Sequence, residues 1–206
     1  MTIPLKYPAA MEAAIASYDY IDVANGAGYN LFYGIASELE IGGAGVASYA
    51  LITNTQAYSS NPVTSNTGIG PNKIAFSLSP FNLPRLAQGT AYLSCGLGAG
   101  AGAIAKISGA IIQHVRNNVE TDITALAKSG TITNDSKMMF LPMPLTPTKF
   151  KRGDILRLRI TLWSSVAGAA SVEIGNDPKN QAGSYIIPGT KDSTIMALHM
   201  PFKVDL

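Results

Sequence analysis

The side chains best suited to nucleophilic or acid–base chemistry are two histidines and the only cysteine, namely His114, His199 and Cys95. A catalytic cysteine needs a neighbouring base and surroundings that lower its pKa, and a histidine metal site needs further ligands at fixed spacing. Cys95 lies in an uncharged, glycine-rich stretch, and no third ligand accompanies either histidine. We therefore interpret both histidines as solvent-facing or packing residues and Cys95 as a buried structural thiol.

The acidic residues form two close pairs, Asp19 with Asp22 and Glu120 with Asp122. Glu120 and Asp122 would share one face of a strand, as paired glycosidase acids or calcium ligands might. Two like charges on one face of a strand more often mark a solvated edge of a sheet. Asp177 stands in a turn, but the spacing of an EF-hand loop is absent. We predict no catalytic residues, no metal site and no cofactor.

Three further motifs have both a structural and a functional interpretation. Residues 96–102 alternate glycine with leucine or alanine, but a phosphate-binding loop needs a helix directly after it, and residues 103–115 are β-like. Arg152, Gly153 and Asp154 match a tripeptide that some cell-adhesion receptors bind, yet glycine and aspartate also favour a tight turn. We favour a flexible turn for the first motif and a tight turn for the second.

A basic stripe on one outer face is the third motif, formed by Lys149, Lys151, Arg152, Arg157 and Arg159. Because the net charge of the chain is only +2, this stripe favours pairing between subunits over nucleic-acid binding. Arg157 and Arg159 are expected to meet a neighbouring subunit or solvent.

These residues must be positioned by strands, and the clearest strand signal covers residues 155–163. Its apolar side consists of Leu156, Leu158, Ile160 and Leu162, and its polar side of Arg157, Arg159 and Thr161. This alternation with period 2 is typical of a half-buried strand. Residues 138–163 are predicted to form a hairpin, with a proline-rich turn at Pro142, Pro144 and Pro147 and a tight turn at residues 151–154.

The same alternation predicts strands in most of the chain, at residues 18–23, 29–35, 46–53, 73–78, 89–95, 103–115, 119–126, 172–174 and 194–206. Residues 54–72 contain almost only Ser, Thr, Asn, Gly and Pro and are expected to form a long loop, and residues 128–136 a shorter polar one. Pro201 cannot donate a hydrogen bond to a neighbouring strand, so it predicts an edge strand or a bulge.

Composition limits the possible classes of protein. The chain has 206 residues, of which 14% are charged, well below the roughly 25% of soluble domains in general. A single cysteine excludes an internal disulfide. No apolar run approaches the ~20 residues of a membrane span, and the first residues lack the apolar core of a signal peptide. We expect no membrane association and no specific nucleic-acid binding.

The predicted fold is all-β, a single-domain jelly-roll β-sandwich of about eight to ten antiparallel strands. The jelly-roll domain would cover residues 17–206. Residues 1–16 contain the only good helix-forming stretch and are predicted to be an N-terminal arm or a short helix.

Several longer stretches carry a resemblance to a known group of proteins. They are KFKRGDILRLRITLW, VEIGNDPKNQ, IIPGT and ALHMPFKVDL, with DYIDVANGAGYNLFYGI and FSLSPFNLPRLAQGTAYLS earlier in the chain. Together they resemble small jelly-roll virion proteins of bacteriophages, as seen in environmental and marine viruses. The resemblance implies a capsid, decoration or tail-associated subunit, without catalytic residues.

From the pattern and the resemblance we predict a non-enzymatic virion structural protein that acts through subunit–subunit assembly. Its expected partners are further copies of itself and other virion proteins, and its expected location is the virion. The alternative is a carbohydrate- or receptor-binding β-sandwich, such as a phage adhesin. For that alternative the glycan or receptor would contact residues 54–72 and exposed aromatic side chains, with Tyr49, Tyr58, Tyr92, Tyr185 and Trp163 as candidates.

Overall fold

The structure is a computed structural model, and it describes residues 28–41, 44–53, 63–66, 69–100, 102–165, 172–178 and 194–204. Within these ranges the chain is all-β, as predicted, and no helix occurs that is long and apolar enough to cross a membrane. The predicted arm at residues 1–16, the strand at residues 18–23 and Tyr185 lie outside the described residues.

Twelve strands occur in the described part of the chain. They are β1 (Gly28–Ile41), β2 (Ala44–Ile52), β3 (Val63–Asn66), β4 (Gly70–Leu78), β5 (Arg85–Ala99), β6 (Ile104–Arg116), β7 (Val119–Asp122), β8 (Ile132–Thr133), β9 (Ser136–Phe150), β10 (Ile155–Ser164), β11 (Val172–Gly175) and β12 (Met196–Val204).

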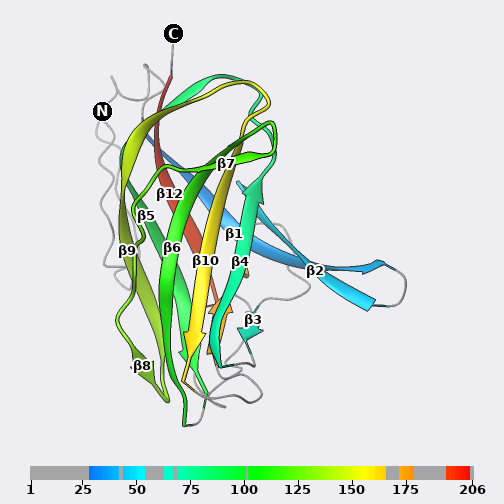
Figure 1. Cartoon of the computed structure of the whole chain (residues 1–206), viewed down its shortest axis with the longest axis vertical. Coiled ribbons are helices and arrows are strands. Elements are labelled where there is room, and N and C mark those ends of the chain that lie inside the picture. The colour runs from blue at the N-terminus through cyan, green and yellow to red at the C-terminus, as the bar shows by residue number, and fades with distance from the viewer. Residues whose placement is uncertain are drawn as a thin grey trace, which may run out of the picture.

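Hydrogen bonds join these strands in the order β3-β11-β5-β12-β1-β2-β4-β10-β6-β7, with β9 paired to β5 and β8 paired to β6. All the pairings are antiparallel except that of β2 with β4, which is parallel. The predicted set of purely antiparallel strands is therefore wrong in this one pairing. Figure 1 shows β6, β10 and β4 in front of β5, β12 and β1.

The core lies between these strands and follows the alternation seen in the sequence. Along β10, Leu156, Leu158, Ile160 and Leu162 are fully buried, whereas the intervening side chains are partly exposed. Met196, Leu198, Met200 and Phe202 of β12 are buried in the same way. Period-2 patterning thus predicted the inner faces of both strands correctly, because successive side chains of a strand point to opposite sides.

Residues 138–163 do not form the predicted hairpin. β9 pairs with β5, whereas β10 pairs with β4 and β6. The tight turn at residues 151–154 exists, but it carries the chain from one group of strands to the other (Figure 1). Alternation in the sequence shows which side of each strand faces the core but not which strands pair. The sequence alone could therefore not distinguish a β9–β10 hairpin from a crossover between two groups of strands.

The three prolines at 142, 144 and 147 lie inside β9 and do not form the predicted turn. Pro142 lies opposite Tyr92, and Pro144 lies opposite Thr90 of β5. Among the described strands β9 pairs only with β5; its other side forms an isolated bridge from Leu145 to Thr124 and is otherwise an edge, where a residue without an N–H costs no ladder bond. Pro201, in contrast, lies in β12 between β5 and β1, and the register of β12 on β5 shifts between His199 and Phe202, which confirms the predicted bulge.

Two predicted loops contain strands. β3 and the start of β4 fall within residues 54–72, and β8 falls within residues 128–136. The glycine-rich stretch begins inside β5, which runs to Ala99. The strand β6 follows it directly, so the helix needed by a phosphate-binding loop is absent there, as the sequence indicated.

Candidate functional site

The crossover between β9 and β10 is held by its own hydrogen bonds. Gly153 has a φ of 90°, a conformation that glycine adopts without strain, and the N–H of Asp154 donates to the Lys151 carbonyl at 3.1 Å. The turn is docked on Phe81, whose N–H donates to the Asp154 carbonyl at 2.9 Å and whose carbonyl accepts from Gly153 at 2.8 Å. These bonds fix the direction of the Asp154 side chain, which is only 3% exposed.

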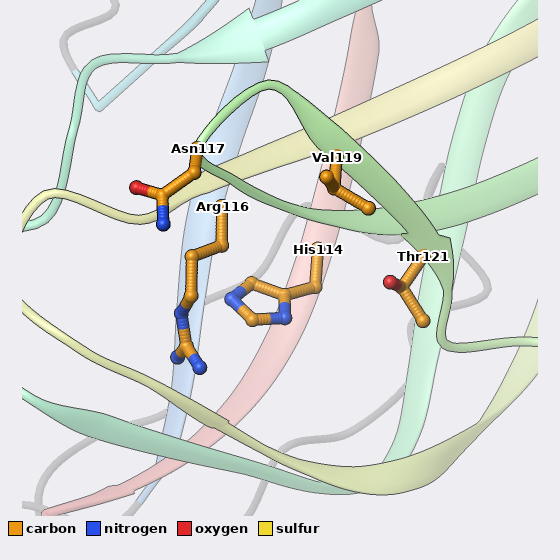
Figure 2. Close-up of a pocket in the computed structure, with 5 residues that line it drawn as sticks. All are labelled: His114, Arg116, Asn117, Val119 and Thr121. Atoms are coloured by element: carbon orange, nitrogen blue, oxygen red, sulfur yellow. The ribbon is translucent and has the colours of Figure 1, made fainter.

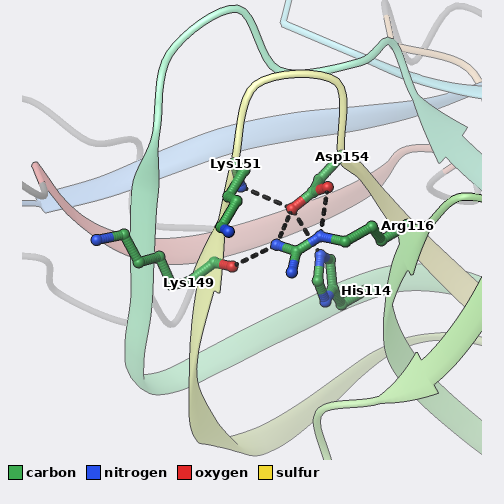
Figure 3. A network of polar contacts seen from close by, with 5 residues as sticks. All are labelled: His114, Arg116, Lys149, Lys151 and Asp154. Atoms are coloured by element: carbon green, nitrogen blue, oxygen red, sulfur yellow. Dashed lines mark hydrogen bonds and ion pairs between the residues drawn. The ribbon is translucent and has the colours of Figure 1, made fainter.

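The buried Asp154 carboxylate is the centre of a polar network (Figure 3). Its Oδ2 accepts from His114 Nε2 at 2.8 Å, from the Lys151 N–H at 2.6 Å and from Arg116 Nη2 at 2.5 Å, and its Oδ1 accepts from Arg116 Nε at 2.9 Å. Arg116 Nη2 also donates to the Lys149 carbonyl at 3.2 Å. Both ends of the crossover are thereby joined to β6.

Arg116 sets the charge state of this carboxylate. Its hydrogen bonds hold the pKa of Asp154 well below the usual range; burial acts in the opposite direction, and the Lys151 N–H and the His114 ring lower the pKa further. The same pairing raises the pKa of Arg116. Asp154 is thus a buried anion whose charge is balanced by a neighbouring cation. It is not an exposed adhesion ligand, which agrees with the turn reading of Arg152, Gly153 and Asp154.

His114 and Arg116 project to the inner side of β6, since His114 lies opposite the buried Leu156 of β10. Across the β6–β7 hairpin, Thr121 lies opposite His114, and Val119 lies opposite Arg116. These side chains therefore meet at one end of the core.

A pocket of about 350 Å³ opens at this end of the core. Its lining residues are His114, Arg116, Asn117, Val119 and Thr121 (Figure 2). The β6–β7 hairpin, which forms one side of the pocket, turns through Asn117 and Asn118. Both residues lie in the left-handed region, with φ values of 51° and 64°. Asparagine tolerates this conformation better than most residues, which explains why the turn forms here.

The orientation of the His114 ring follows from its two contacts. Its Nε2 points to Asp154, and the imidazole and Phe150 rings pack in a T-shaped arrangement with their centroids 4.7 Å apart. Figure 2 shows Nδ1 on the side of the ring that faces Thr121. The side chain is 11% exposed, so the sequence interpretation of a packing histidine holds, but the buried carboxylate partner was not foreseen.

Two members of the predicted basic stripe, Arg157 and Arg159, meet the predicted acidic pair Glu120 and Asp122 within the same chain. Arg157 of β10 donates to Glu120 of β7, and Arg159 lies 4.0 Å from Asp122. Asp122 also accepts from the Nε2 of Gln113 at 2.8 Å. Both arginines thus have acidic partners within the chain, which the sequence interpretation did not foresee, and both side chains remain partly exposed on this outer face. In the described part of the chain, no group of three or more His, Cys, Asp or Glu side chains could hold a metal.

The opposite outer face carries aromatic side chains and no paired charges. Tyr92 of β5 stacks on Phe140 of β9 with ring centroids 5.2 Å apart and an interplanar angle of 18°, and Tyr29 of β1 lies 6.0 Å from Tyr92. Phe140 is 47% exposed and Met138 is 44% exposed. We call this surface the aromatic face; its members are Met138, Phe140, Pro142 and Pro144 of β9, Thr90 and Tyr92 of β5, His199 and Pro201 of β12, and Tyr29, Leu31 and Tyr33 of β1.

His199 is the one titratable imidazole of the aromatic face. It lies opposite Tyr92 of β5 on one side and Leu31 of β1 on the other. Burial lowers the pKa of His199 below its usual value, so the ring is neutral at neutral pH. Lys203 lies further along β12, beyond Pro201, at the rim of this face.

Cys95 does not form a nucleophile with either histidine. Its thiol is fully buried on the inner side of β5, and burial raises its pKa to about 12. His199 belongs to the opposite, outer side of the neighbouring strand β12, and His114 is engaged by Asp154. A thiolate is the reactive form of cysteine, so Cys95 is inert in the folded chain, as its sequence context indicated.

Comparisons with known proteins give structural neighbours but no relatives in sequence. No family model and no curated protein matches the chain. A CocE/NonD family hydrolase from Staphylococcus aureus is similar at 12% identity and a TM-score of 0.46, over 86% of this chain and 36% of the hydrolase. An α-amino acid ester hydrolase is similar at 12% identity and a TM-score of 0.31, over 64% of this chain and 24% of that one.

A structure of the Gx strain of infectious bursal disease virus is more distant, at 9% identity and a TM-score of 0.21, over 85% of this chain and 57% of that chain. The chain spans about a third of the length of the first hydrolase. The hydrolase neighbours contradict the predictions of a non-enzymatic virion structural protein and of no enzyme, and both are withdrawn. Likeness at this distance gives no activity to this chain.

Removal of the Asp154 charge should destabilise the fold strongly. Asp154→Asn keeps the shape of the side chain but removes the charge that accepts hydrogen bonds from Arg116, His114 and the Lys151 N–H, and a hydrogen bond to a charged group contributes about 1.5–3 kcal/mol. Asp135→Asn is the matched control, because Asp135 pairs with Lys137 at 2.9 Å on the surface, where ion pairs contribute little to stability. Urea unfolding at pH 7 measures both. Equal losses in the two variants would contradict the central role of Asp154.

Proposed function

We propose that the chain associates with a second copy of itself through the aromatic face. The single observation that carries this proposal is the exposed stack of Tyr92 on Phe140 in the centre of a sheet face whose members carry no permanent charge, with Lys203 at its rim. Exposed apolar side chains gathered on one surface are typical of interaction sites, and aromatic residues are enriched in the buried centres of such interfaces.

Burial of this face would be favourable because its side chains are apolar and already held in place. Removing apolar area from water stabilises a complex by roughly 25 cal/mol per Å². The rings of Tyr92 and Phe140 restrict each other by stacking, and the Tyr29 hydroxyl is tied to the Thr90 carbonyl at 3.1 Å. Little side-chain freedom would therefore be lost on association.

The absence of charge favours a second copy as the partner. In a two-fold symmetric interface the same surface meets itself, so a charged side chain near the axis would face its own like charge. The aromatic face avoids this repulsion at neutral pH. The opposite outer face is a poorer candidate, because its arginines already pair with Glu120 and Asp122.

For the described strands we infer the finer fold, a jelly-roll β-sandwich. Buried residues of β6, β10, β5 and β12 belong to one hydrophobic core, and the chain passes between the two groups of strands at residues 151–154. The glycan-binding alternative has less support. Of its candidate aromatic residues, Tyr92 belongs to the aromatic face, Tyr49 packs against Phe76 of the core, and Trp163 is covered by Lys106 on β6.

A charge at the centre of the aromatic face should prevent association. Phe140→Asp removes the stacked ring and places two carboxylates in a symmetric interface, so we expect the dissociation constant to rise at least thirtyfold, as for an interface residue worth about 2 kcal/mol. Leu83→Asp is the matched control, since Leu83 is 69% exposed outside this face. Sedimentation velocity over a concentration series measures both variants and the unmodified chain.

Concentration-dependent association that Phe140→Asp abolishes and Leu83→Asp retains would support the proposal. A strict monomer at hundreds of micromolar would overturn it, and so would equal effects of the two substitutions.

Association should also weaken in acid. Because burial lowers the pKa of His199, the folded chain prefers the neutral ring, and a pH below that lowered pKa places a charge in the aromatic face of each copy. The neighbours of His199 across the sheet, Tyr92 and Leu31, offer no carboxylate to balance it. We expect the affinity between copies to fall on the order of tenfold for each unit by which association lowers the pKa of His199 further. Sedimentation at pH 7.5 and pH 5 measures it, and His199→Gln should remove most of the pH dependence.

A further inference from the structure

We propose that the pocket at the β6–β7 hairpin binds a small neutral polyol. The wall of this pocket offers hydrogen-bond acceptors and donors, and those of His114 and Arg116 are held in position by the network around Asp154. The site is separate from the aromatic face, so the two proposals stand independently.

One acceptor is His114 Nδ1. Three N–H groups outside the ring, one from Lys151 and two from the Arg116 guanidinium, donate to the Asp154 carboxylate, and a carboxylate in such surroundings acts only as an acceptor. The proton of a neutral His114 ring therefore belongs on Nε2, which leaves the lone pair on Nδ1. Nδ1 accepts no hydrogen bond from the described residues and faces the side of Thr121 (Figure 2). A ligand hydroxyl can donate to it.

The donors come from Arg116 and the hairpin. Arg116 uses Nε and Nη2 for Asp154 and for the Lys149 carbonyl, whereas Nη1 has no hydrogen bond within the described part of the chain. The hydroxyl of Thr121 can both donate and accept, and so can the side-chain amide of Asn117. Adjacent hydroxyl groups on a ligand match this mixture, because each can donate to one wall group and accept from another.

Charge balance at the site favours a neutral ligand. Asp154 compensates the guanidinium of Arg116 through two hydrogen bonds, and the remaining lining residues carry no permanent charge. An anion would meet no uncompensated cation there, and a cation would meet no uncompensated carboxylate. Val119 adds an apolar wall suited to C–H groups. The volume of about 350 Å³ lies within the range of small-molecule pockets.

Nuclear magnetic resonance of the folded chain tests the proposal through the His114 ring nitrogens. At pH 8 we expect the ring to carry a proton on Nε2, which the Asp154 carboxylate accepts, and the lone pair on Nδ1. Addition of glycerol or myo-inositol should shift the Nδ1 resonance saturably at millimolar concentrations. Acetate and inorganic phosphate, added at the same concentrations and ionic strength, should not.

Thr121→Val removes one hydroxyl from the wall and should weaken polyol binding about tenfold, the effect of one hydrogen bond. Thr133→Val is the matched control on β8, away from the pocket, and should leave binding unchanged. No saturable shift with either polyol at 50 mM, stronger binding of acetate or phosphate, or equal effects of the two substitutions would each overturn the proposal. A ring protonated on Nδ1 in place of Nε2 would overturn it without any ligand.

Discussion

The buried carboxylate of Asp154 is the interaction on which the arrangement of this chain depends. It lies at the point where the chain leaves β9, paired with β5, and enters β10, paired with β4 and β6. Hydrogen bonds from Arg116 and His114 tie that crossover to β6, and the backbone of Phe81 docks the turn from the other side. A buried charge is tolerated only when such partners compensate it, so the carboxylate, the guanidinium and the turn stabilise one another.

The same network places His114 and Arg116 in the wall of the pocket at this end of the core. Away from this network, the two outer faces differ in their content of charged side chains. The face of β10, β6 and β7 pairs its arginines with acids of the same chain, whereas the aromatic face holds stacked rings and a histidine kept neutral by burial. Charges are therefore paired within the chain on one side, and apolar side chains are exposed on the other.

Local patterns predicted the all-β class, the inner faces of β10 and β12, the bulge at Pro201 and the burial of Cys95, because each depends on neighbours in sequence. Contacts between residues that lie far apart in the sequence were not predictable. Nothing in the spacing of His114 and Arg116 indicates that both bind a carboxylate some forty residues later in the chain. Arg152, Gly153 and Asp154 indicate a tight turn, but nothing in this tripeptide indicates that Asp154 is buried and paired. The prolines of β9 were predicted to form a turn because the position of a strand at the edge of a sheet cannot be derived from its own sequence.

The ionisation of Asp154 tests the central claim most directly. In the unfolded chain its carboxyl should titrate at the ordinary pKa of about 3.9, whereas Arg116 holds the folded-state pKa below that range. The stabilisation is therefore present above the unfolded-state pKa and is lost as the pH falls through the folded-state pKa. Carbon-detected magnetic resonance of the Asp154 carboxyl between pH 7 and pH 3 should show it ionised for as long as the chain is folded. A titration of the folded chain centred near pH 4 would contradict the account.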